Sequence, residues 1–161
     1  MKRIMFVCSG NICRSPLAHR VFEHHLRQEG VEGRFHVESS GIGSWHVGEN
    51  IDPRMRGTAR EHGLNISHRA QQLSAADLEE YDLILVMEQS HRRQIERQAR
   101  DPEIMEKVRL FREWDPKGGP TAEVPDPYYG GGSGFEEVYQ MVDRTSKALL
   151  DDILSEKEEA V

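Results

Sequence analysis

The sequence contains few cysteines and no long hydrophobic run. Only Cys8 and Cys13 occur in 161 residues, too few for the disulfide framework of a small secreted domain. No apolar run approaches the ~20 residues that cross a bilayer. The apolar run at residues 4–7 is also too short for a signal peptide. These absences predict a cytoplasmic protein with reduced thiols and no membrane association.

Positive charge is also scarce compared with negative charge. Lys and Arg number 21 and Asp and Glu number 28, for a net charge of -7. A general nucleic-acid binder needs a basic face, so no nucleic-acid partner is expected. A small anionic substrate stays compatible with this charge, because one positive pocket can lie in an acidic protein. The length predicts a single domain over residues 1–161, with a polar tail at residues 154–161 that frays.

Short apolar segments alternate with amphipathic segments along the chain. Strands are expected at residues 4–7, 35–39, 83–87 and 108–111. Helices are expected to begin at or near Ser15, Asp52, Ser74, Gln89 and Phe135. The helix from Gln89 is strongly charged and predicted to be exposed, and residues 112–134 are predicted to form a long loop.

Strands separated by helices predict a three-layer α/β fold, in which a four-stranded parallel sheet carries helices on both faces, as in flavodoxin-like proteins. Ligands bind such folds beyond the carboxyl ends of the strands. Residues 8–15 follow the first predicted strand and precede a helix, so they lie at such a position.

Residues 8–15 (CSGNICRS) combine a thiol with groups that bind anions. Backbone N–H groups of such a loop converge on one point, and the following helix N-terminus adds positive potential. Gly10 permits backbone conformations closed to other residues, and Asn11 tolerates left-handed geometry and can brace the loop. The fork of donors on Arg14 suits two phosphate oxygens. Together these groups favour a Cys8 thiolate that attacks a bound phosphoryl group.

The full string of residues around Cys8 is much more specific than the spacing of Cys8 and Arg14 alone. Cys-x5-Arg alone is weak, since an isolated cysteine after a strand is commonly a small core residue. The longer string Val-Cys-x-Gly-Asn-x-Cys-Arg-Ser-Pro is far more specific. It is not a Walker loop, because no Gly-x4-Gly-Lys-Ser/Thr occurs.

Two separated motifs resemble one known family. Residues 6–16 resemble the signature of the low-molecular-weight protein tyrosine phosphatases, and residues 126–130 (DPYYG) resemble that family's acid loop. Trp45 and residues 52–54 and 62–63 also lie where the family has counterparts, so the resemblance covers residues 2–154. It implies a phosphatase I type of fold and a protein-tyrosine phosphatase that needs no metal and no cofactor.

The resemblance implies a phosphocysteine mechanism. Cys8 would attack phosphorus, Arg14 and the loop amides would hold the equatorial oxygens, and Asp126 would protonate the leaving phenolate and then activate water. Asp115 precedes a proline in the same loop and is a weaker candidate for the acid.

The remaining site residues are expected in two groups. Those that bind the substrate are Ser9, Gly10, Asn11, Ile12, Cys13, Trp45, Tyr128 and Tyr129. Those that support the loop are Ser15, Ser39 and His68, with Ser40 as an alternative to Ser39. Cys13 is interpreted either as a packing residue or as the disulfide partner that protects Cys8 from oxidation.

The aromatic residues favour phosphotyrosine as the substrate. Trp45, Tyr128 and Tyr129 can form a slot for an aromatic ring, flanked by His46. A deep slot excludes phosphoserine, whose phosphorus would not reach the thiolate. The expected partners are phosphotyrosine proteins, with a cognate tyrosine kinase left open, and the expected state is a monomer or a weak homo-oligomer.

Four alternative functions share parts of this chemistry. A protein-arginine phosphatase of the same family would carry Thr at Ile12 and Phe at Tyr128. An arsenate reductase would need further cysteines downstream, which are missing. A phosphocysteine carrier would have no use for Arg14 and Asp126. A non-catalytic phosphotyrosine-binding module would leave the nucleophile and the acid unexplained.

Overall fold

The computed structural model describes residues 1–99, 101–127 and 133–159. Four strands form one parallel sheet in the order β2-β1-β3-β4. The strands are β1 (Lys2–Cys8), β2 (Phe35–Gly41), β3 (Leu83–Val86) and β4 (Val108–Leu110). Cys8 pairs with Gly41, and Val7 pairs with Val86. The carboxyl ends of the three neighbouring strands β2, β1 and β3 therefore meet at one edge of the sheet.

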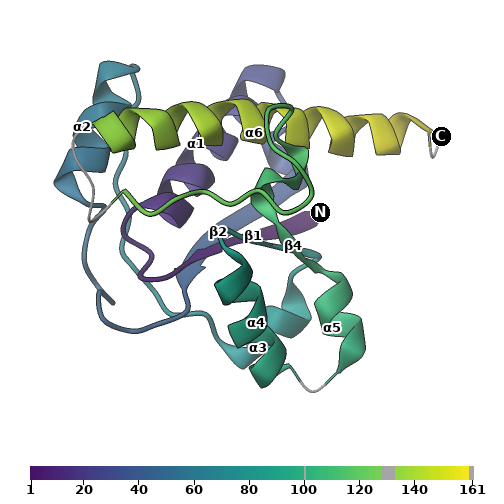
Figure 1. The fold of residues 1–161 in the computed structure, drawn as a ribbon. Coiled ribbons are helices and arrows are strands. Elements are labelled where there is room, and N and C mark those ends of the chain that lie inside the picture. The colour runs from purple at the N-terminus through teal and green to yellow at the C-terminus, as the bar shows by residue number, and fades with distance from the viewer. Residues whose placement is uncertain (100, 128–132, 160–161) are drawn as a thin grey trace.

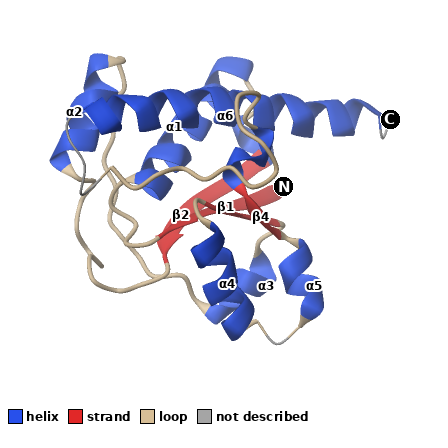
Figure 2. Cartoon of the chain, in the orientation of Figure 1, coloured by secondary structure: helices blue, strands red, loops and turns tan. Residues whose placement is uncertain are grey.

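Helices cover both faces of the sheet, as Figures 1 and 2 show. One face carries α1 (Arg14–Glu29), α2 (Pro53–Glu61) and α6 (Ser133–Glu159), and the other carries α3 (Ala75–Glu80), α4 (Gln89–Gln98) and α5 (Pro102–Glu106). Two short 3₁₀ helices, η1 (Glu32–Arg34) and η2 (Phe111–Trp114), complete the described structure. The predicted three-layer α/β fold with a four-stranded parallel sheet is confirmed.

The alternation of β1 divides the core between the two faces. Phe6 points toward α1 and α6, where its ring meets the edges of Phe22 at 5.8 Å and Phe111 at 5.3 Å between centroids. Met5 and Val7 point to the opposite face and pack in the second core cluster. Side chains along a strand alternate between faces, so Cys8 emerges at the end of β1 on the side of Phe6.

Local signals define several helix ends, and the predicted helix starts at Asp52 and Ser74 are confirmed. Asp52 caps α2 by accepting a hydrogen bond from the N–H of Arg54 at 2.8 Å. Ser74 and Asp77 form a capping box at the start of α3. Gly30 ends α1 in the left-handed conformation, with φ of 68°, which costs glycine little.

The structure corrects several element predictions. Strand β2 continues to Gly41, two residues beyond its predicted end, and α5 was not predicted at all. Helix α4 buries His91 and Ile95, although its charged sequence suggested full exposure. Helix α6 runs from Ser133 to Glu159, so it begins two residues before the predicted start at Phe135. The predicted fraying of the tail at residues 154–161 stays a prediction.

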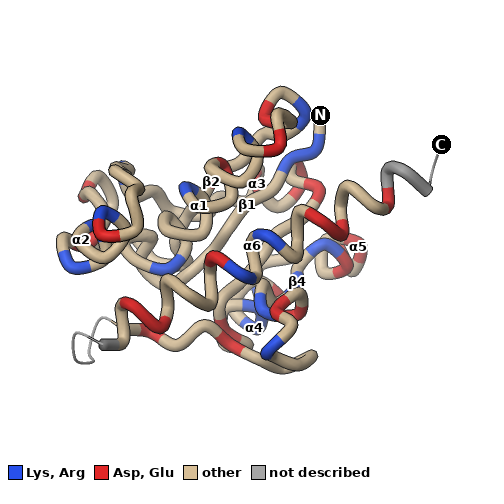
Figure 3. The backbone as a smooth tube through the Cα atoms, turned by 90° about the horizontal axis from the view of Figure 1, so that it is seen from above, with Lys and Arg blue, Asp and Glu red and all other residues tan. Residues whose placement is uncertain are grey.

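The surface mixes the two signs of charge. Helix α6 carries acidic and basic residues along its length, as Figure 3 shows. None of the helices in the described part of the chain is both long and apolar enough to cross a membrane.

Candidate active site

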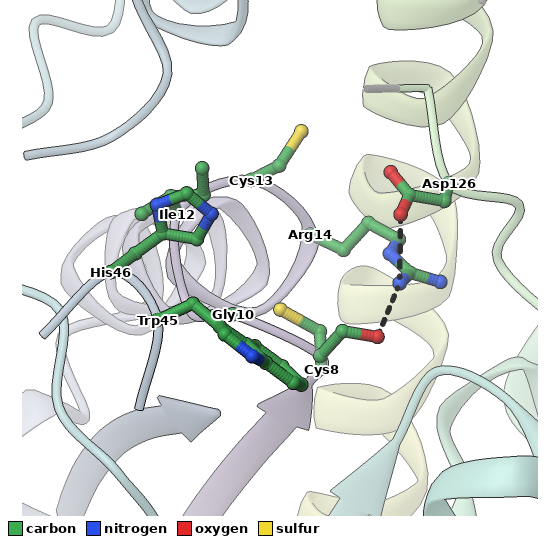
Figure 4. Close-up of a pocket in the computed structure, with 9 residues that line it drawn as sticks. Cys8, Gly10, Ile12, Cys13, Arg14, Trp45, His46 and Asp126 are labelled. Carbon is green, nitrogen blue, oxygen red and sulfur yellow. Dashed lines mark hydrogen bonds and ion pairs between the residues drawn. The ribbon is translucent and has the colours of Figure 1, made fainter. Parts of the chain in front are cut away.

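A cavity of about 350 Å³ opens at the carboxyl edge of the sheet, beside the loop that joins β1 to α1 (Figure 4). Its lining brings together residues from three distant parts of the chain, namely Cys8, Ser9, Gly10, Ile12, Cys13, Arg14, Trp45, His46 and Asp126. Every described residue that was predicted to bind substrate or perform chemistry lines it, except Asn11. The predicted Tyr128 and Tyr129 lie outside the described residues.

Cys8 is the last residue of β1, and its side chain is buried at the base of the cavity. Helix α1 begins at Arg14, so the free N–H groups of its first turn lie at the end of the loop and favour an anion there. The sulfur of Cys8 lies 2.9 Å from Oγ of Ser15. When the sulfur is a thiolate, the Ser15 hydroxyl is the donor in this contact.

Asn11 holds the loop in place through four side-chain contacts. It has φ of 60° and is the one non-glycine residue of the described chain with positive φ. Its amide nitrogen donates to Oγ of Ser15 at 2.8 Å and to Oγ of Ser39 at 3.1 Å. Its amide oxygen accepts from the N–H of Gln71 at 2.9 Å and contacts Nε2 of His68 at 2.8 Å. Because a backbone N–H only donates, the Gln71 contact fixes which end of the amide is oxygen, and all its bonding capacity is used.

The supporting serine is Ser39, not Ser40. Oγ of Ser39 contacts Asn11, His68 and Nδ1 of His19 at 3.2 Å. The Ser40 hydroxyl instead donates to the sulfur of Met5, away from the loop. Burial, followed by the charges of His19 and Arg20, lowers the pKa of His68 to about 4, so the ring is neutral at neutral pH.

Arg14 is buried and held from several sides. Its Nη1 donates to the carbonyl oxygen of Val124 at 2.9 Å and lies 3.1 Å from Oε1 of Glu88. Its Nη2 lies 3.6 Å from Oδ2 of Asp126 and 3.4 Å from Oγ of Ser9. Figure 4 shows the last two contacts as dashed lines. The guanidinium is therefore oriented toward the cavity by protein contacts alone.

The two candidate acids occupy different environments. Asp126 is partly exposed and lines the cavity. Asp115 has a fully buried side chain that binds Arg112 and Arg144, each at 2.8 Å. Burial alone would raise the pKa of Asp115, but hydrogen bonds from Arg144, the Lys117 N–H and Arg112 outweigh it and lower the pKa to about 2. Asp115 thus ties η2 to α6 and lies away from the lining of the cavity.

Two glycines shape the loop by close approach. The φ of Gly10 is not in the left-handed region, which corrects the expected role. A Cβ on Gly10 would instead lie 2.8 Å from the ring of His46. A Cβ on Gly41 would lie 2.9 Å from backbone atoms of Gly10 and Ser9. Gly41 was not singled out in the sequence, yet only glycine fits there without moving the loop.

Trp45 and His46 lie on the side of the cavity opposite Asp126 (Figure 4). Trp45 is 72% exposed, and its ring lies where a Cβ on Gly43 would be. His46 is held by Glu49, with 2.7 Å between Nδ1 and the carboxylate. An exposed indole at the rim of a cavity can stack on an aromatic substrate ring.

Cys13 is buried, and both cysteines are free thiols. Burial, followed by the charge of Cys8, raises the pKa of the Cys13 thiol well above its ordinary value. This environment keeps Cys13 a poor nucleophile. The proposed disulfide with Cys8 stays a prediction.

Besides Gly41, four residues of the site were missed in the sequence. Gln71 and His19 extend the network around Asn11, and Glu88 and His91 lie behind Arg14 and Ser9. The neighbours of each in space are known only once the fold is known. A Glu88-x-x-His91 pair directly after a buried strand is the one signal that could have indicated them, because strand ends position ligand-binding residues.

Comparison with known proteins places this chain in one family. Residues 3–159 match the model of the family described as low molecular weight phosphotyrosine protein phosphatase. The low molecular weight protein-tyrosine-phosphatase of Streptomyces coelicolor is 41% identical over 149 residues, which cover 92% of this chain and 91% of that protein. The low molecular weight phosphotyrosine protein phosphatase of Sus scrofa is 37% identical over 153 residues, covering 94% and 96%.

The solved structures agree with this. The crystal structure of a protein tyrosine phosphatase from Entamoeba histolytica superimposes with a TM-score of 0.91 at 27% identity, covering 98% of this chain and 99% of that one. The chain belongs to the low molecular weight phosphotyrosine protein phosphatase family.

Proposed function

We propose that this chain hydrolyses phosphotyrosine in proteins, with Cys8 as nucleophile, Arg14 as phosphate ligand and Asp126 as general acid and base. One observation carries the proposal. The guanidinium of Arg14, which begins the helix after the Cys8 loop, lies 3.6 Å from the carboxylate of Asp126 at the same cavity. A nucleophile, an anion ligand and an acid thus converge where a phosphate ester can bind.

The chemistry follows in two steps. The Cys8 thiolate attacks phosphorus and forms an S–P bond while the P–O bond to the phenolate breaks, and Asp126 gives its proton to the leaving oxygen. Asp126, now ionised, then takes a proton from water, whose oxygen attacks phosphorus and releases phosphate and the thiolate. Arg14 and the loop amides stabilise the charge on the equatorial oxygens in both steps.

The lining of the cavity supports an aromatic substrate. Trp45 presents an exposed ring at the rim, and Ile12 lines the cavity with an apolar side chain. A phosphoarginine guanidinium carries N–H donors, and the Ile12 side chain has no hydrogen-bond acceptor. Binding phosphoarginine there would therefore leave buried donors unpaired. A phenyl ring has no such requirement.

The roles of Cys8 and Asp126 can be tested with two aryl phosphates of different leaving-group pKa. Cys8→Ser is expected to reduce hydrolysis of p-nitrophenyl phosphate to background. Asp126→Ala is expected to slow phenyl phosphate by about 10²–10⁴-fold and p-nitrophenyl phosphate by less, because p-nitrophenolate leaves without a proton. Asp115→Asn is the matched control and should retain the leaving-group dependence of the unmodified enzyme. Equal losses on both substrates would remove Asp126 from the role of acid.

The substrate class can be tested with phosphotyrosine, phosphoserine and phosphoarginine peptides of the same sequence. Phosphotyrosine is expected to give the highest kcat/KM. Ile12→Thr, which adds a hydrogen-bonding group at the same position, should shift the ratio toward phosphoarginine. A preference for phosphoarginine in the unmodified enzyme would contradict the assignment.

The cellular setting is inferred from the thiols. Cys8 and Cys13 are both free, and a thiolate nucleophile survives in a reducing compartment. We therefore infer cytoplasmic action on phosphotyrosine proteins. Whether a tyrosine kinase acts on the same substrates can be tested by isolating phosphoproteins trapped by Asp126→Ala.

A further inference from the structure

Ser9 lines the cavity next to Cys8, and a buried histidine contacts its hydroxyl. Oγ of Ser9 lies 2.9 Å from Nε2 of His91, which comes from α4 on the opposite face of the sheet. The side chain of His91 is 2% exposed. A buried polar ring requires hydrogen-bond partners, and Ser9 is one of them.

The other ring nitrogen shows which way the hydrogen bond runs. The backbone N–H of Glu88 donates to Nδ1 of His91 at 3.2 Å. Because a backbone N–H cannot accept, Nδ1 carries no proton, and the proton of the neutral ring is on Nε2. His91 therefore donates to Ser9, with Oε2 of Glu88 as a second neighbour of Nε2 at 3.3 Å.

The neutral form of His91 persists at neutral pH. Burial, followed by the charge of Arg14, lowers the pKa of His91 to about 4, although Glu88 and Asp126 oppose the shift. The hydrogen bond therefore runs from His91 to Ser9 throughout the neutral pH range.

The remaining contact of Ser9 determines where its own proton points. Nη2 of Arg14 lies 3.4 Å from the same oxygen, and guanidinium groups only donate. The two lone pairs of the hydroxyl thus face two donors, His91 and Arg14. Within the described residues Ser9 meets no acceptor, so its O–H is left directed at the cavity.

We propose that Ser9 donates a hydrogen bond to an oxygen of the bound phosphoryl group, and that His91 is a positioning residue that orients the Ser9 hydroxyl for this role. This inference rests on the proposed function. It adds a side-chain donor to the ligands that the loop amides and Arg14 supply. A donor that is oriented before substrate binds stabilises developing charge without reorganisation.

The first test compares Ser9→Thr with Ser9→Val, two side chains of the same shape that differ by the hydroxyl. Ser9→Thr is expected to retain kcat/KM for p-nitrophenyl phosphate within about threefold. Ser9→Val should lose about 10- to 100-fold, the range for a hydrogen bond to a charged group. It should also bind orthovanadate, which becomes five-coordinate when a thiolate adds to it, correspondingly more weakly. Equal kcat/KM in the two variants would overturn the role of Ser9.

The second test separates the two nitrogens of His91. Gln at position 91 can place an N–H near Nε2, whereas Asn reaches only the position of Nδ1. His91→Gln is expected to retain most of the activity, and His91→Asn to lose about as much as Ser9→Val. In the Ser9→Val background, His91→Asn should cause no further loss. A further loss of the same size, or equal damage by Gln and Asn, would overturn the positioning role.

If a variant at position 91 fails to fold, the comparison of Ser9→Thr with Ser9→Val still tests the proposal, because these two variants keep His91. Thermal unfolding of each variant identifies such a failure. Turnover of p-nitrophenyl phosphate by the unmodified enzyme reports on the proposed function separately from the Ser9 variants. Absence of that turnover would contradict the function, whereas turnover without a Thr-Val difference would contradict only this inference.

Discussion

At the scale of single residues, Asn11 carries two separate properties. Its backbone adopts φ of 60°, which asparagine tolerates better than most residues. Its side chain joins Ser15, Ser39, His68 and the backbone of Gln71. One property allows the loop to turn, and the other holds the turned loop against β2 and the segment around residue 70.

Substitution of Asn11 by Gly and by Ala can separate these properties. Asn11→Gly keeps the backbone freedom and removes the four contacts, so kcat/KM is expected to fall by about tenfold or more. Asn11→Ala also places a Cβ in left-handed geometry, which adds about 1 kcal/mol to the loss of stability. Kinetics on p-nitrophenyl phosphate and urea unfolding measure the two effects. An Asn11→Gly enzyme with unchanged kinetics would contradict the bracing role.

Residue roles were predictable where the pattern is local. Cys8, Asn11 and Arg14 lie within seven positions of one another in the sequence, so their spacing alone suggested an anion loop. His91 is 82 positions from Ser9, and Gln71 is 60 positions from Asn11. Their participation depends on the sheet order and on where loops cross the surface, which periodicity does not determine. The charged residues around His91 also predicted an exposed helix, so its burial was not expected.

At the scale of elements, the end of β2 acts as a template for the loop. Gly41 pairs with Cys8, and its missing side chain leaves room for the backbone of Ser9 and Gly10. Backbone atoms cannot rotate away as a flexible side chain can, so any Cβ there must displace the loop.

Gly41→Ala is therefore expected to damage activity more than folding. The shift of the loop backbone should misplace the loop amides relative to the phosphate, and kcat/KM is expected to fall by up to about 10²-fold, the cost of a misplacement of about 1 Å. The free energy of unfolding should fall by about 1–3 kcal/mol, as for other overpacked sites. Gly57→Ala, at a position with open space around a Cβ, is the control and should retain activity. Unchanged kcat/KM for Gly41→Ala would contradict the template role.

Elements with strong end signals were predicted well, and those without were not. Asp52 followed by proline, and Ser74 with Asp77, define helix starts through their own hydrogen bonds. Helix α5 has only five residues, too few for its periodicity to be recognised. The burial of Ile95 on α4 follows from packing of that helix against the sheet, which a short charged segment does not reveal.

At the scale of the whole molecule, buried titratable groups make the fold sensitive to acid. The pKa of His91 and of His68 is lowered to about 4, from an ordinary 6.5. Below pH 6.5 the unfolded chain binds protons that the folded chain does not, so stability falls as the pH drops from about 6.5 to about 4. Asp115 and Glu23 have a pKa of about 2, so their contribution is lost at still lower pH, as the pH falls from about 4 toward 2.

Urea unfolding at about pH 7, 5.5 and 4.5 is expected to show this loss. The shift at His91 corresponds to about 3 kcal/mol over that range, and the half-buried His68 adds less. In the double variant His68→Gln, His91→Gln, the free energy of unfolding should depend less on pH, because neither position then titrates. The same free energy of unfolding at about pH 7 and 4.5 in the unmodified protein would contradict this account.

The position of β1 in the sheet affects how the site is made during synthesis. This strand lies between β2 and β3, so it has no hydrogen-bonding neighbour in the sheet until residues 35–41 and then 83–86 have been synthesised. Arg14 has to wait longer still, for the carbonyl of Val124. A growing chain therefore carries the reactive thiol of Cys8 long before Val124, which holds Arg14 at the cavity, has been translated. Assembly of the pocket is coupled to completion of the fold.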